Sequence, residues 1–380
     1  MRSLDLGVVR IAPRRAEIRW RGAGELALVE TLPLGFDGAS EEDRHRWMGA
    51  FRRLLDALDS PLQVVVDVRP GADAESLEQA VMPASRQGMR GADMAFVADI
   101  RRSRSSHRVS TTFVIDKGHA GRLEAALSEV GVGHATRTLE PAVLFGRETP
   151  HSFLHPGGFS RTWYAERLPG TELEPGWWHR LLPGGLRLTL SWHVTPLPVA
   201  WIVGYLQRQL INMKASRMVE ASAGTWDPAL AGALPNAEDL QRRLSSSQDK
   251  AFHISLYLTL TAPAREDLEL GAMQISSAAR AVLCDLQPCT FRMLDGLIAT
   301  MPGGPDRLQR KRVIDTAALV TFFPWHDGDL QQAGGLVVGR SRATGAPVVV
   351  NPFEQGRFAN AKTSVRIYVI HASRDLRTHK

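Results

Sequence analysis

Cysteine is scarce in this sequence, where Cys284 and Cys289 are the only two among 380 residues. Two cysteines cannot build a disulfide framework, and no cysteine–histidine group has the spacing of a zinc finger. The sequence therefore excludes a disulfide-stabilised scaffold, and we expect no metal site. A reducing compartment such as the cytoplasm fits this composition.

Long apolar runs are also missing. The best candidate, residues 197–206, ends at Gln207 and Arg208, well short of the ~20 apolar residues that a membrane-crossing helix needs. Residues 1–12 lack the continuous apolar region of a signal peptide. We therefore expect no transmembrane span, a cytoplasmic location, and association with a membrane only at its periphery through a partner.

Lysine supplies only six of the 46 basic residues, and arginine supplies the rest. The net charge of +6 and the pI near 9.7 are compatible with contacts to phosphates or to an anionic membrane. However, arginines alternate with acids, as in residues 41–44, which is typical of a solvated surface. A basic DNA-binding protein is therefore an alternative interpretation and not the favoured one.

The first part of the chain has the pattern of a compact α/β domain, to which we assign residues 1–145. The expected elements are strands at residues 6–11, 17–20, 25–32, 62–68 and 109–116 and helices from Ser40, between 74 and 103, and at 118–130. Prolines and glycines between residues 140 and 159 indicate a linker or an extended connection. The domain boundary is placed there.

The second part, residues 146–380, has the pattern of an α+β domain that ends in a β-hairpin and a basic tail. The expected elements are strands at residues 160–168, 186–193 and 252–260, helices at 199–221, 236–249 and 266–283, and a hairpin at 336–351. This order predicts a mostly antiparallel sheet with helices packed on one face. The fold class expected for the chain is α+β, without a complete RecA-like motor domain.

Residues 356–363 approximate the phosphate-binding loop G-x-x-x-x-G-K-[ST], with Gly356, Lys362 and Thr363 in the expected places. Ala361 replaces the second glycine, and its Cβ hinders a close approach to phosphate. Too few residues follow this loop for the remaining strands of a nucleotide-binding domain. We therefore expect no catalytic residue and no ATP or magnesium bound by this chain, with an active ATPase using the degenerate loop as the alternative.

Histidines and aromatic residues are further candidates for a site. His151 and His155 are four residues apart, but the adjacent prolines argue against the helix that a metal site at this spacing needs. His193 and His253 lie on alternating strands, where a structural imidazole is favoured over a catalytic base. Six aromatic residues are favoured as a core, with a partner-binding surface as the alternative. They are Trp163, Tyr164, Trp177, Trp178, Trp192 and Trp201.

Residues 301–360 carry a series of short motifs in a fixed order. They are Met301-Pro-Gly-Gly-Pro-Asp306, Arg312-Val-Ile-Asp-Thr316, Phe323-Pro324, Thr344-Gly345, Asn351-Pro-Phe353 and Asn360. In this order they resemble the type IV secretion (conjugal transfer) ATPases of the TraC, TrbE and CagE class, just before the phosphate-binding loop of that family. Weaker resemblance extends back to residues 248–252 and 40–70. After Asn360 the pattern departs from the family, since the glycine-rich loop is replaced.

The resemblance implies a cytoplasmic protein docked at the inner membrane of a secretion apparatus. Its partners would be inner-membrane components of a type IV secretion system and neighbouring copies of itself. We interpret the chain as the assembly and docking part of such an ATPase, non-catalytic as it stands. Exposed apolar surface is expected at residues 319–325 and 336–338, where an absent motor domain would pack.

Overall fold

The computed structural model describes most of the chain between residues 6 and 350. The described residues are 6–12, 15–20, 25–31, 34, 36, 41–70, 107–138, 144–170, 173–224, 227–245, 249–325, 336–340 and 347–350. The helical stretch predicted between residues 74 and 103 and the degenerate loop at 356–363 lie outside them. The described part is an α+β fold with seven α-helices and a large, open antiparallel sheet.

Thirteen strands form this sheet, and every pairing in it is antiparallel. The order of neighbours is β1-β2-β7-β8-β9-β11-β10-β4-β5-β3-β6, with β12 beside β9 and β13 beside β11. The strands are β1 (Leu6–Ala12), β2 (Arg15–Trp20), β3 (Leu26–Thr31), β4 (Leu62–Pro70), β5 (His107–Asp116), β6 (His134–Thr138), β7 (Leu144–Glu148), β8 (Phe153–His155), β9 (Gly158–Arg167), β10 (Arg187–Pro196), β11 (Ala251–Ala262), β12 (Asp285–Pro288) and β13 (Arg312–Asp315). The predicted hairpin is confirmed as β14 (Leu336–Arg340) paired with β15 (Pro347–Val350).

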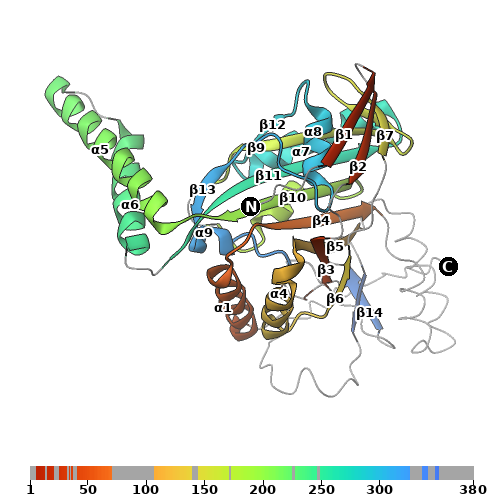
Figure 1. The fold of residues 1–380 in the computed structure, drawn as a ribbon, viewed down its shortest axis with the longest axis horizontal. Coiled ribbons are helices and arrows are strands. Elements are labelled where there is room, and N and C mark those ends of the chain that lie inside the picture. The colour runs from red at the N-terminus through yellow and green to blue at the C-terminus, as the bar shows by residue number, and fades with distance from the viewer. Residues whose placement is uncertain are drawn as a thin grey trace, which may run out of the picture.

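The helices occupy both faces of the sheet (Figure 1). They are α1 (Glu41–Ala57), α4 (Lys117–Val130), α5 (Val199–Ala223), α6 (Pro228–Ser245), α7 (Arg265–Ala281), α8 (Met293–Thr300) and α9 (Thr316–Val320), with a 3-10 helix at Trp177–Leu181. Residues of α1, α4, α7 and α9 share one large core with the sheet. The short helix α8 packs in a separate core on the opposite face, so the prediction that helices cover one face only was wrong for α8.

Alternation along β11 explains why there are two cores. Leu256 and Leu258 point into the larger core, whereas Tyr257 between them packs against α8. Successive side chains of a strand point to opposite faces, so one strand can supply both layers. The alternating patterns that predicted β10 and β11 are confirmed, and each strand extends a few residues beyond its prediction.

The face of the sheet that α8 covers carries hydrogen-bonded polar groups in addition to apolar side chains. Gln63 Nε2 donates to Ser191 Oγ (3.0 Å) and to the Met301 carbonyl (2.9 Å), while its Oε1 accepts from Gly303 N (2.7 Å). Asp306 accepts hydrogen bonds from Ser255 and Tyr257 of β11. The loop at residues 301–311 is therefore fastened to the sheet.

The apolar side chains of residues 319–325 are buried, and the prediction that they form exposed apolar surface was wrong. Trp325 packs between Phe51 of α1 and Phe113 of β5, and Phe323 contacts both Phe51 and Trp325. The Trp325 indole N–H donates to Thr31 Oγ1 (2.8 Å). This segment fills the larger core itself, so no additional domain is needed to cover it. The side chains of residues 336–338 are outside the described set.

The segment predicted as a linker, residues 140–159, contains β7 and β8 in its described part. The boundary predicted between residues 145 and 146 falls inside β7, and strands from both sides of it share the sheet: β4 pairs with β10 over seven residue pairs. Pro150 lies in the turn between β7 and β8, where a proline does not interrupt a ladder. Strand pairing thus continues across a proline-rich stretch.

Candidate interaction surface

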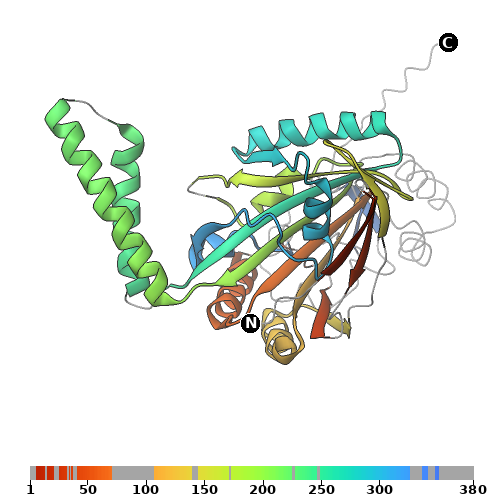
Figure 2. The same ribbon diagram turned by 45° about the horizontal axis from the view of Figure 1, so that its top comes forward.

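Helices α5 and α6 form an antiparallel hairpin that connects β10 to β11, and we call residues 199–245 the arm. Figures 1 and 2 show the arm projecting beyond one end of the sheet, away from the other helices. At its root, Leu197 N donates to the Ala251 carbonyl (2.9 Å) where the two strands separate. Gly224, at φ +66°, ends α5 in the left-handed conformation that glycine adopts without strain.

The root of the arm is packed, with Ile202 and Leu206 of α5 meeting Leu244 of α6 and Ala251 of β11 in a small buried cluster. Trp201 lies beside this cluster. Its ring stacks on Tyr205 at a centroid distance of 5.4 Å and contacts the edge of His253 at the same distance. These contacts fix the first two turns of α5 against the sheet.

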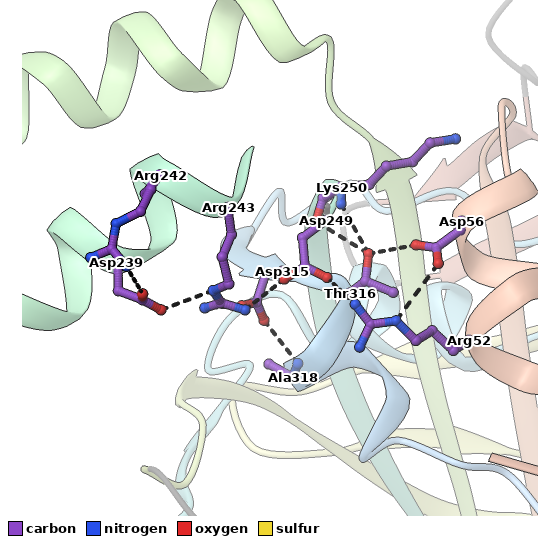
Figure 3. A network of polar contacts seen from close by, with 10 residues as sticks. All are labelled: Arg52, Asp56, Asp239, Arg242, Arg243, Asp249, Lys250, Asp315, Thr316 and Ala318. Carbon is purple, nitrogen blue, oxygen red and sulfur yellow. Dashed lines mark hydrogen bonds and ion pairs between the residues drawn. The ribbon is translucent and has the colours of Figure 1, made fainter. Parts of the chain in front are cut away.

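A network of charges joins α6 to the body of the protein (Figure 3). Its centre is Asp249, whose side chain is only 2% exposed. One carboxylate oxygen accepts a 2.5 Å hydrogen bond from Arg52 of α1, and the other accepts a 2.5 Å hydrogen bond from Arg243 of α6. Both bonds are charge-assisted, the stronger class of protein hydrogen bond. The buried carboxylate is thus paired on both sides.

The network continues into α9. Arg243 also contacts Asp315 (2.9 Å) and Asp239 (2.9 Å), and Asp315 Oδ1 accepts from Ala318 N at the start of α9. Thr316 Oγ1 donates to Asp56 of α1 (2.9 Å) and accepts from the backbone N–H of Lys250 (3.0 Å). Because α1, α6, β13, α9 and the two residues just before β11 all contribute, the network sets the direction in which the arm leaves the sheet.

Beyond the root, α5 exposes large apolar side chains. Ile211 is 60% exposed, Met218 is 73% exposed and Val219 is 65% exposed. Arg208, Lys214 and Arg217 are the charged residues between positions 199 and 219, so this stretch of α5 is basic as well as apolar. Exposed apolar residues gathered on a projecting element indicate an interaction surface.

The histidine candidates have structural contacts. His155 Nδ1 accepts from Gly157 N, and its Nε2 lies 2.8 Å from Ser160 Oγ. His193 Nε2 donates to the Ala299 carbonyl (2.8 Å). Burial lowers the pKa of His155, His193 and His253 from the usual 6.5, which favours neutral imidazoles. Within the described ranges no three histidine, cysteine or acidic side chains are grouped to hold a metal ion.

The aromatic group divides into core and surface members. Trp163, Trp177, Trp178 and Trp192 are buried in the larger core, which confirms the favoured interpretation for these four. Tyr164 is partly buried under the guanidinium of Arg310, 4.7 Å from the ring centre. Trp201, on the arm, is 43% exposed and remains available to a partner.

Gly356, Lys362 and Thr363 lie outside the described residues, so their arrangement is not part of this site. The sequence-based candidates included neither the charged network nor the arm as a surface. One signal was present for the arm: apolar residues of α5 fall on more than one side of the helix, whereas a helix lying on a core has them on one side. The network gave no local signal, because Arg52 and Asp249 are 197 residues apart.

No described helix combines the length and apolar character required to span a membrane. No protein-family model matches the chain, and the search for similar curated proteins finds no match.

Proposed function

We propose that this chain is the assembly and docking part of a type IV secretion (conjugal transfer) ATPase, and that it performs no catalysis by itself. The observation that carries the proposal is the arm: a helical hairpin with exposed apolar side chains, held in one direction by a buried charged network. A rigid projecting element suits a protein that positions other subunits. The resemblance of residues 301–360 to this class of ATPases supports the same function.

In this proposal, residues 1–145 serve as the α/β N-terminal part and residues 146–380 as the part that precedes a motor domain, with no complete motor in the chain. The protein acts in the cytoplasm, at the periphery of the inner membrane, where it contacts inner-membrane components of the secretion system and other copies of itself. The fastening of residues 301–311 by Gln63, Ser255 and Tyr257 gives these family-like residues a structural role.

Cell fractionation tests this function. The tagged chain is expressed in two matched strains of the bacterium that encodes it. One strain keeps all of its secretion genes, and the other lacks only the genes for the inner-membrane components. We expect the chain to sediment with the inner membrane in the first strain and to stay in the supernatant in the second. The same distribution in both strains would contradict the proposal.

The ATPase alternative has its own test. Purified chain and its Lys362→Ala variant are compared for ATP binding and hydrolysis, and we expect no difference between them. Hydrolysis that disappears in the variant would favour an active ATPase. The DNA-binding alternative predicts affinity for duplex DNA that falls steeply with salt, because phosphate contacts release counterions; we expect weak binding with little salt dependence.

A further inference from the structure

We draw no further inference here: the strongest candidate, the exposed apolar side of α5 in the arm, carries none, because nothing in the described part of the chain shows what covers it.

Discussion

Asp249 and Arg243 connect the arm to the body through a 2.5 Å hydrogen bond between Oδ2 and Nη1, made where the carboxylate is almost completely shielded from water. Arg243 belongs to α6, and Asp249 lies just before β11. The same carboxylate binds Arg52 of α1. The direction of the arm therefore depends on one buried acid with two arginine partners.

Asp249→Asn should lower the free energy of unfolding by about 2 kcal/mol, because both arginines lose their charged acceptor while the amide stays buried. Both arginine side chains are partly exposed, so the loss is smaller than for a completely buried pair. Asp239→Asn is the control: this acid also pairs with Arg243 but is 47% exposed, and its change should stay within about 0.5 kcal/mol. Urea titrations measure both, and equal losses would show that burial of Asp249 is unimportant.

Gly304→Ala should destabilise the fold strongly. A Cβ on Gly304 would lie 1.7 Å from the Ile298 carbonyl oxygen, at the end of α8, and this contact is with backbone. We expect a loss of roughly 3 kcal/mol or more, since the 301–311 loop must lift from the sheet. Gly121→Ala, in α4 with open space around it, should instead stabilise by about 0.5–1 kcal/mol. Similar melting temperatures for the two variants would contradict this account.

Acid should destabilise the protein through His193. Burial lowers its pKa from 6.5, Asp306 and the Ala299 carbonyl oppose this shift, and Lys311 adds to it. Below pH 6.5 the unfolded chain therefore binds a proton that the folded protein does not, and stability falls as the pH decreases through this window. Above it, this group contributes no pH dependence. Urea midpoints at about pH 7.5 and about pH 5.5 measure the effect.

His193→Gln is the matched variant for this pH effect, because it keeps a donor for the Ala299 carbonyl and cannot titrate. It should show a smaller decrease in stability between the two pH values. A remaining decrease is expected from His155 and His253, whose pKa values are lowered in the same direction. A pH dependence that is the same in the variant and the wild-type chain would exclude His193 as a contributor.

Cys284 and Cys289 should react only when the protein unfolds. Both are buried, and burial raises the pKa of each thiol to about 12, so thiolate is rare at neutral pH. Reaction with an aromatic disulfide reagent should therefore be slow in buffer and complete in urea. Ser216→Cys, on the exposed side of α5, should add one fast-reacting thiol. Rapid modification of the native wild-type protein would contradict the burial of these cysteines.

Strand and helix types were largely predictable from local pattern. The alternation at residues 186–193 and 252–260 predicted β10 and β11, and the apolar run at 199–221 predicted α5, because these patterns are set by each element's own period. The start of α6 was placed eight residues too late, since Pro235 suggests a break. A proline in the middle of a helix is usually unfavourable, and here the helix continues through it.

Contacts between distant segments could not be predicted. Nothing near Asp249 in the sequence identifies Arg52 as its partner, and nothing near Trp325 identifies Phe51 and Phe113. For this reason residues 319–325 were expected to be exposed, although they complete the core. The arm as a surface was missed for a related reason: its length and type follow from the sequence, but its projection depends on where β10 and β11 end.

The position of β4 in the sheet has a consequence for synthesis on the ribosome. β4 has β5 on one side and β10 on the other, and Gln63 and Ser191, whose side chains are hydrogen-bonded across the second pairing, are 128 residues apart. Translation proceeds at roughly 5–20 residues per second, so β10 is synthesised about 6–26 s after β4. During that interval its valines and one row of backbone hydrogen-bonding groups have no partner strand. The nascent chain is therefore most prone to aggregation before its middle has been translated, and chaperone capacity at that stage will limit the yield of folded protein.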